Sequence, residues 1–186
     1  NAHVLPEATG LSDGPALVVQ VRGGDGQWQR RSVVREQRDD AHDLAVLRME
    51  GSPVAALRLG DSGRVREGDE LAFTGFPIGG VLGYSPVTHR ATISSITPAA
   101  LPSPTARSLQ DRAVRGLRDG TFDIFQLDAT AYPGNSGGPL FDPQTGEVLG
   151  VLNMVLIKGT RESALSQPSG IAYAIPVTHV QPLLRR

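Results

Sequence analysis

A serine enclosed by glycines is the segment of this sequence best suited to chemistry. Ser136 lies in AYPGNSGGPLFD, residues 131–142, with Gly134 two positions before it and Gly137 and Gly138 directly after it. A glycine costs about 0.5–1 kcal/mol relative to alanine in regular structure. Such a cluster therefore indicates a backbone that takes an unusual path or approaches another group closely. The alternative is a plain glycine-rich turn between FDIFQLDA, residues 122–129, and PLFD, residues 139–142.

The same glycines could serve a nucleophilic serine. A serine hydroxyl attacks a carbonyl group when a base takes its proton and fixed donors receive the charge that moves to the substrate oxygen. If Gly134 turns the chain, its amide and that of Ser136 can point the same way and form an oxyanion hole. Loss of one such donor typically costs about 2.7–4 kcal/mol of transition-state stabilisation. The segment therefore predicts acyl-transfer chemistry at Ser136.

The base for this serine would be a histidine, because the chain has no cysteine and only four histidines: His3, His42, His89 and His179. Asp43, in HDLAVLR, is a suitable orienting carboxylate because it lies at the start of a strand-like alternation. His42 and His3 are the candidates for the base. Adjacent residues of a strand point to opposite faces, so His42 is poorly placed to meet Asp43. The other two histidines are interpreted as surface or packing residues.

Short apolar or alternating segments, rich in Val, Ile, Thr, Phe and Tyr, recur along the chain between Gly, Pro and Asp. These segments are residues 16–22, 27–36, 43–49, 69–76, 87–96, 122–129, 147–157 and 170–176. Their composition and spacing predict an antiparallel all-β protein. A sandwich or barrels are the candidate architectures, because closure of a sheet removes its exposed edges.

Two segments predict short helices instead. Residues 103–120 offer Ser103 as an N-cap, Pro104 in the first turn and Gly120 as a stop, which predicts a surface helix inside a long connection. Its arginines are interpreted as an ordinary solvated face. In the tail VTHVQPLLRR, Thr178 and Gln181 have the spacing of a capping box, which predicts a terminal helix on the barrel surface.

Composition excludes several functions. The chain has 186 residues, a formal net charge of -1 and a pI of about 6.5, so no global field attracts nucleic acid. No run of about 18 apolar residues predicts a membrane span. No metal-ligand spacing such as H-x-x-x-H and no phosphate-binding loop is present, so no cofactor is expected. The chain begins NAHV without a methionine, and residue 1 is therefore not expected to be the natural start.

Several motifs together resemble a known family. NAHV, HDLAVLRM and FQLDATAYPGNSGGPLFDPQTGEVLGV, followed by GIAYAIP, resemble the protease domain of the HtrA/Deg family of trypsin-like serine proteases over most of the chain. The resemblance implies that His3 is the general base, that Asp43 orients it, and that Ser136 is the nucleophile. It also assigns the oxyanion hole to the amides of Gly134 and Ser136. The implied fold is two six-stranded antiparallel β-barrels with the active site between them.

The resemblance also implies a substrate and a binding surface. An unfolded or extended polypeptide would pair with LNMVL, which contains Asn153, Met154 and Leu156, as an added β-strand. Ala131 would lie near the base of the primary pocket, with Met154 and Leu156 along its wall. Because none of these residues is a carboxylate, small or medium aliphatic side chains are expected there. A trypsin-like barrel that binds peptides or partners without cleaving them is the alternative.

The resemblance divides residues 1–186, taken as one domain, into three parts. Residues 1–100 would form the N-terminal barrel, truncated at its start and therefore open, with the first strands of the second barrel. Residues 101–121 would be an inserted loop, and residues 122–186 would complete the second barrel and the terminal helix. Relatives sense activators near residues 97–121, so a peptide activator is expected there. A homotrimer and an extracytoplasmic location, in a bacterial periplasm or secreted, are further implications.

Overall fold

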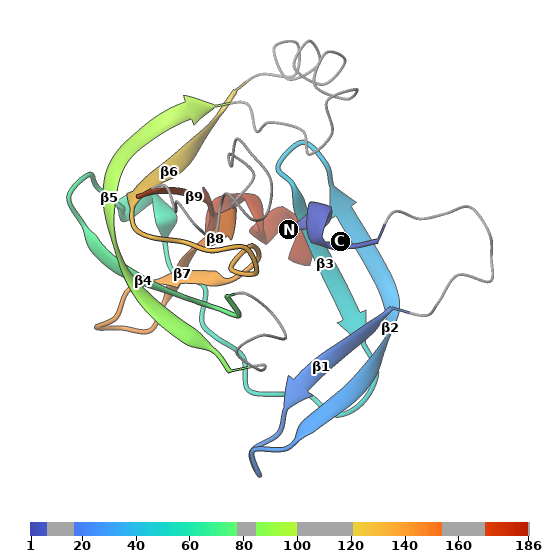
Figure 1. The fold of residues 1–186 in the computed structure, drawn as a ribbon. Helices are drawn as coiled ribbons and strands as arrows, with labels where there is room; N and C mark the ends of the chain where they lie inside the picture. The colour runs from blue at the N-terminus through green and yellow to red at the C-terminus, as the bar shows by residue number, and fades with distance from the viewer. Residues whose placement is uncertain (7–16, 78–84, 100–120, 154–169, 186) are drawn as a thin grey trace.

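A computed structural model describes residues 1–6, 17–77, 85–99, 121–153 and 170–185. These residues form two β-rich units side by side, an N-terminal sheet and a larger closed barrel (Figure 1). Helical structure in them is limited to short turns and one short terminal helix. The predicted all-β fold class is therefore confirmed.

The N-terminal unit is an open antiparallel sheet of three strands in the described part of the chain. Its strands are β1 (Val18–Arg22), β2 (Trp28–Asp39) and β3 (Leu44–Met49), in the order β1-β2-β3. A short 3-10 helix, η1 (Ala2–Val4), precedes them. The amide of Ala2 donates a hydrogen bond of 3.0 Å to the carbonyl of Asp43, which fixes η1 at the start of β3.

The second unit is a closed barrel with the strand order β4-β5-β6-β9-β8-β7. All of its strand pairs are antiparallel. The strands are β4 (Glu70–Gly75), β5 (Val87–Ala99), β6 (Phe122–Asp128), β7 (Pro139–Phe141), β8 (Val148–Asn153) and β9 (Ile171–Pro176). Closure pairs every strand on both sides, so the barrel is a rigid support for the loops at its rim.

The barrel interior is the main core. Alternate residues of each strand point inward, and the most deeply buried of them include Phe73, Leu127, Leu140 and Leu152, each 0% exposed. Leu140 comes from β7, a strand of three residues directly after the glycines around Ser136. The sequence patterns did not predict β7, because a strand this short shows no alternation. The core thus extends to the edge of the glycine-rich loop.

A smaller apolar cluster joins the two units. Leu44 of β3 packs with Ile175 of β9 and Leu183 near the C-terminus. The chain between the units adds a second connection, since the amide of Gly60 donates to Val148 and the amide of Val148 donates to Arg58, each at 2.8 Å. The sheet is therefore fixed against the barrel both by packing and by backbone hydrogen bonds.

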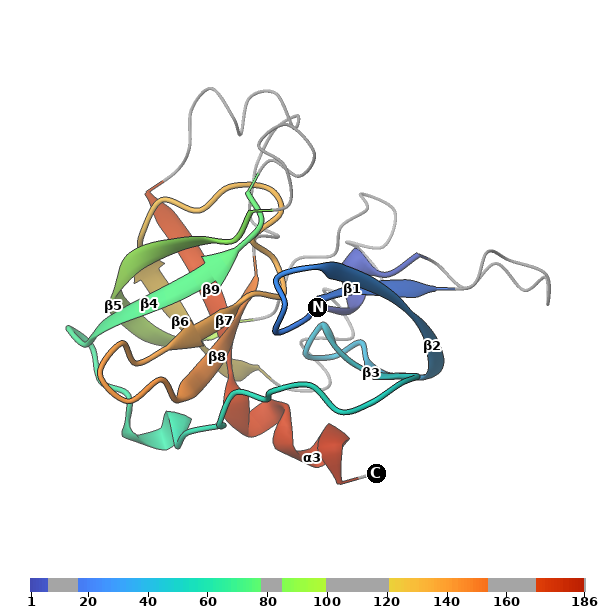
Figure 2. The ribbon, with the colours of Figure 1, turned by 90° about the horizontal axis from the view of Figure 1, so that it is seen from below.

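The C-terminal segment forms a 3-10 helix, η4 (Val177–His179), and then α3 (Gln181–Leu184), which lies under the junction of sheet and barrel (Figure 2). The predicted terminal helix is confirmed, but its predicted cap is wrong. Thr178 lies within η4, and α3 begins without a side-chain cap. Pro182 fits in the first turn, where the amide of a helix has no intrahelical partner.

The helix predicted for residues 103–120 lies outside the described residues. Within the part of the chain that is described, no helix is both long and apolar enough to cross a bilayer. In the described residues before the barrel, helical structure consists of two short 3-10 segments, η1 and η2 (Ser62–Arg64).

Candidate active site

The imidazole of His3 and the carboxylate of Asp43 form a direct pair, although 40 residues separate them in sequence. The distance between His3 Nδ1 and Asp43 Oδ2 is 2.5 Å. The backbone amide of His3 donates a second hydrogen bond, of 2.8 Å, to Asp43 Oδ1. The two side chains are only 19% and 15% exposed, so the pair is partly shielded from water. With Asp43 on Nδ1, the second ring nitrogen, Nε2, is the one that can exchange a proton with a substrate or nucleophile.

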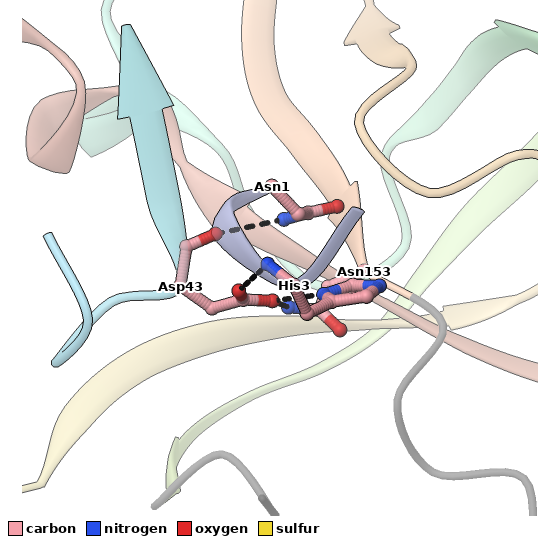
Figure 3. Close-up of polar contacts among 4 residues, drawn as sticks. All are labelled: Asn1, His3, Asp43 and Asn153. Atoms are coloured by element: carbon pink, nitrogen blue, oxygen red, sulfur yellow. Dashed lines mark hydrogen bonds and ion pairs between the residues drawn. The ribbon is translucent and has the colours of Figure 1, made fainter. Parts of the chain in front are cut away.

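Two further groups hold Asp43 from different elements (Figure 3). The side-chain amide of Asn153, at the end of β8, donates a hydrogen bond of 2.8 Å to Asp43 Oδ2. The side-chain amide of Asn1 donates a hydrogen bond of 3.2 Å to the backbone carbonyl of Asp43. Asp43 itself has a φ of 52°, a left-handed conformation unusual for a residue other than glycine. Such strain persists where surrounding contacts fix it and is frequent at functional sites.

The surroundings of Asp43 favour its ionised form. Burial alone would raise the pKa of the Asp43 carboxyl, but the hydrogen bonds from the His3 side chain and backbone, with nearby positive charge, lower that pKa below its ordinary value. An acid with a lowered folded-state pKa stabilises the fold above its ordinary pKa, and this contribution is lost as the pH falls through the folded value. At neutral pH Asp43 is therefore a hydrogen-bond acceptor that fixes the His3 ring.

The loop around Ser136 is shaped by its glycines. Gly134 and Gly137 have φ values of 104° and 85°, in the region where a side chain is strained. The amide of Asn135 donates to Tyr132 at 3.0 Å, and that of Gly137 donates to Leu152 at 2.8 Å. Among the described residues, by contrast, the amides of Gly134 and Ser136 donate to no carbonyl. Two amide donors of the serine loop, one of them that of Ser136 itself, are thus without a partner among the described residues.

Two further glycines, Gly75 and Gly138, lie where a neighbouring group leaves no room for a side chain. A Cβ on Gly75 of β4 would lie 2.5 Å from Asn135 Oδ1, so this glycine makes room for the fully buried Asn135 side chain. A Cβ on Gly138 would lie 2.2 Å from the carbonyl oxygen of Thr74. Because that oxygen belongs to the backbone of β4, it cannot move aside as a flexible side chain would. The glycine cluster is therefore required by packing against β4 as well as by the path of the chain.

We expect the substitution Gly138→Ala to destabilise the fold by about 1–3 kcal/mol, the usual cost of overpacking a well-packed site. The measurement is urea unfolding of the variant and the wild type. Gly24→Ala is the matched control, since a Cβ there meets nothing within 4 Å, and its stability should stay within about 0.5 kcal/mol. Equal stability of Gly138→Ala and wild type would show that the loop does not pack on β4 as described.

The serine loop lies close to the segment that carries His3. A Cβ on Gly137 would be 3.3 Å from the backbone nitrogen of Asn1, two residues before the histidine. Ser136 also borders a cavity of about 560 Å³ that is lined in part by Phe76 and Phe141. The serine is therefore at an accessible surface, in the same region as the His3–Asp43 pair.

The remaining predicted site residues divide into three groups. Met154 and Leu156 lie outside the described residues. Ala131, expected near the base of a substrate pocket, is 4% exposed and packs in the barrel core. Asn153 was expected along the substrate-binding surface, but its side chain contacts Asp43. No sequence signal indicated that contact, because it depends on barrel closure between residues 110 positions apart.

Two other predicted features can be compared with the structure. His42, the second candidate for the base, bonds to Asp39 at 2.8 Å and not to Asp43. Among the residues that the structure describes, no group of three or more His, Cys, Asp or Glu side chains could hold a metal ion. What the site contains is a shielded His–Asp pair and, close to it, a serine with two available amides.

The family described as Trypsin-like peptidase domain matches residues 1–151 of this chain. The chain therefore belongs to the family of trypsin-like peptidase domains. Within it, the resemblance to the HtrA/Deg proteases is confirmed. Proteins named Serine protease HTRA2, mitochondrial, from Drosophila ananassae and Drosophila virilis are 31% and 30% identical to it over 186 residues. The chain spans 37% of the length of each of these relatives.

Solved structures agree with this assignment. The structure titled HtrA-type protease AlgW with tripeptide has a TM-score of 0.63 and 28% identity, and the match covers 90% of this chain and 46% of the other. The same protease with decapeptide has a TM-score of 0.62 and 27% identity, with 90% and 43% covered. The Rv3671c protease in its inactive form, at 21% identity and a TM-score of 0.59, supports the fold alone.

Proposed function

We propose that this chain is the catalytic domain of a serine endopeptidase in which His3, Asp43 and Ser136 form the triad. The observation that carries the proposal is the 2.5 Å pair of His3 Nδ1 and Asp43 Oδ2. It is supported by the neighbouring serine loop, in which the amides of Gly134 and Ser136 are left without a partner among the described residues. No observation from these residues favours the alternative, a binding module without catalysis.

The proposed reaction begins with attack of Ser136 Oγ on a peptide carbonyl carbon, while His3 Nε2 takes the hydroxyl proton. The carbonyl oxygen becomes negative and accepts hydrogen bonds from the amides of Gly134 and Ser136. The C–N bond breaks as His3 gives the proton to the leaving amine, which leaves an ester on Ser136. A water molecule, deprotonated by His3, then attacks this ester, and the C–O bond to Ser136 breaks as His3 returns the proton to Ser136 Oγ and the carboxyl product leaves. Asp43 keeps the proton of His3 on Nδ1 throughout.

Asn153 is a positioning residue in this scheme. Its amide bonds to the same Asp43 oxygen that accepts from His3, at 2.8 Å. The donor thus helps to fix the orientation of the carboxylate. Because Asn153 ends β8 and Asp43 precedes β3, the contact also connects the barrel to the sheet at the catalytic pair.

The proposed substrate is an unfolded or extended polypeptide. The peptide-bound structures of the AlgW protease support polypeptide binding by a fold of this kind. The predicted strand addition at residues 152–156 and the preference for small or medium aliphatic side chains stay predictions. Profiling of cleavage products from an unfolded protein tests the preference. A predominance of Lys or Arg before the cut sites would contradict it.

Regulation, assembly and location are proposed from the family. A peptide activator would act near residues 97–121, and activity with and without added peptide, before and after deletion of residues 103–118, tests this role. The homotrimer is tested by the mass of the protein in solution. The fruit-fly relatives are named as mitochondrial, so the predicted periplasmic or secreted location stays a prediction, to be checked by cell fractionation.

The proposed function is tested by incubating the protein with a chemically unfolded polypeptide and following new amino termini. We expect cleavage by the wild type, with and without a peptide activator, and none by the Ser136→Ala variant. Binding of the unfolded polypeptide without cleavage by either protein would instead support the non-catalytic module. Cleavage that persists in Ser136→Ala would assign the reaction to another residue.

A further inference from the structure

A second His–Asp pair lies directly beside the catalytic one, in the turn between β2 and β3. Asp39 accepts two hydrogen bonds from His42, one from the backbone amide at 3.2 Å and one from ring Nδ1 at 2.8 Å. The two side chains are each 26% exposed. Because Asp39 holds both the backbone and the ring of His42, it fixes the turn that ends in Asp43, the residue with left-handed backbone.

The ring of His42 is stacked on a histidine from the barrel unit. The ring centroids of His42 and His179 are 4.2 Å apart, with 25° between their planes. The ring of Phe122, at the start of β6, packs against both: its centroid lies 4.5 Å from that of His42 and 5.0 Å from that of His179. His179 ends η4, which directly follows β9. The turn before Asp43 therefore rests on the barrel through three stacked or edge-packed rings.

Charge decides when this stack is stable. Two imidazoles in face-to-face contact repel each other when both are protonated. Asp39 lies against His42 and can compensate one positive charge. The groups that act on His179 are His42, Asp39 of β2 and Asp123 of β6. Asp43 contributes no bond to the stack, since His3 and Asn153 hold its carboxylate.

The net effect on His179 is unfavourable to its charged form. Burial first, and then the neighbouring His42, lower the pKa of His179, while Asp39 and Asp123 act in the opposite direction. An ordinary histidine has a pKa of about 6.5. When the folded-state pKa is lower than the unfolded one, stability is complete above the ordinary value and is lost as the pH falls below it. Mild acid therefore acts against the stacked arrangement.

We propose that Asp39, His42 and His179 form a positioning cluster for Asp43 that loosens in mild acid and so lowers the activity of the triad. Protonation of His179 against His42 separates the rings, and the turn that carries Asp43 loses its support on the barrel. The inference rests on the proposed function, since it gives the cluster a role in placing a triad residue. It predicts an acid sensitivity of the activity that depends on His179.

The first test is thermal unfolding in a Ser136→Ala background, which removes any self-cleavage. His179→Phe keeps a ring over His42 but cannot be protonated. The melting temperature is measured at about pH 7.5 and about pH 5.5, on either side of the ordinary histidine pKa. Its fall between these two pH values should be about 2–4 °C smaller in His179→Phe than in the parent Ser136→Ala protein. His89→Phe is the matched control, because His89 stacks on Phe73 outside the cluster, and it should behave as the wild type. Equal falls in all three proteins would overturn the proposal.

The second test measures positioning through the rate at which a fluorophosphonate labels Ser136. Every variant keeps the His3–Asp43 pair, so a difference in the ratio of the rates at the two pH values between variants isolates the effect of the cluster. We expect a higher acid-to-neutral ratio in His179→Phe than in wild type or His89→Phe. His179→Gln is the second variant if the phenylalanine does not fold. A ratio equal to wild type would restrict the cluster to stability and overturn the positioning role.

Failure of the proposed function is distinguishable from failure of this inference. If wild type is not labelled at Ser136 at either pH, the triad is wrong. The melting comparison in Ser136→Ala still supports or contradicts the acid-sensitive stack in that case, because it needs no activity.

Discussion

Substitution of His3 by alanine is expected to lower peptidase turnover by about 10⁶-fold, as loss of the base does in a comparable triad. The reason is geometric. His3 is bonded to Asp43 at 2.5 Å, whereas His42 is bonded to Asp39 and stacked on His179. No second imidazole in the described residues is held for the same task. The measurement is kcat/KM on an unfolded polypeptide, with product formation followed by mass spectrometry.

The control for this substitution is His89→Ala, which removes a histidine from β5 and leaves the His3–Asp43 pair intact. Its turnover should stay within about tenfold of wild type, which corresponds to a barrier change of about 1.4 kcal/mol. Circular dichroism of both variants checks that the fold is retained. If His3→Ala kept activity similar to that of the control, His3 would not be the base.

Asp43→Asn is expected to lower turnover by about 10⁴-fold while the protein stays folded. The asparagine keeps the shape of the side chain but presents an N–H group where His3 Nδ1 now finds a carboxylate oxygen. The imidazole is then held in the wrong tautomer, and its positive charge is no longer compensated when it forms. The effect belongs to kcat, so KM should change much less.

Two comparisons sharpen this result. Asp61→Asn removes a carboxylate that caps η2 through Gly63 and is 62% exposed, so its turnover should match wild type. The contribution of Asp43 to stability, present above the ordinary pKa of an aspartate, should also disappear in Asp43→Asn. A variant that is as active as wild type would contradict the orienting role.

The sequence predicted those features that depend on local patterns. Alternating residues around Leu127 and Leu152 indicated strands, and both side chains are now fully buried in the barrel. The glycines around Ser136 indicated a constrained backbone, and the positive φ values of Gly134 and Gly137 agree with that prediction. Local side-chain volume, periodicity and backbone freedom are properties of a short segment, so a sequence alone carries them.

Features that depend on how distant segments meet were not predicted. The donor from Asn153 reaches Asp43 only because β8 closes the barrel beside the start of β3. The stack of His42 on His179 joins the turn before β3 to the C-terminal segment, whereas the sequence around His179 indicates only a surface or packing residue. The left-handed backbone of Asp43 has no local signal either, since its conformation is fixed by contacts from other elements.

The most direct test of the proposed triad is to treat the protein with a fluorophosphonate probe and to map the modified residue by mass spectrometry. We expect one covalent adduct, on Ser136, that disappears in His3→Ala and is strongly reduced in Asp43→Asn. An adduct on a different serine, or labelling of Ser136 that does not depend on His3, would contradict a His3–Asp43–Ser136 triad.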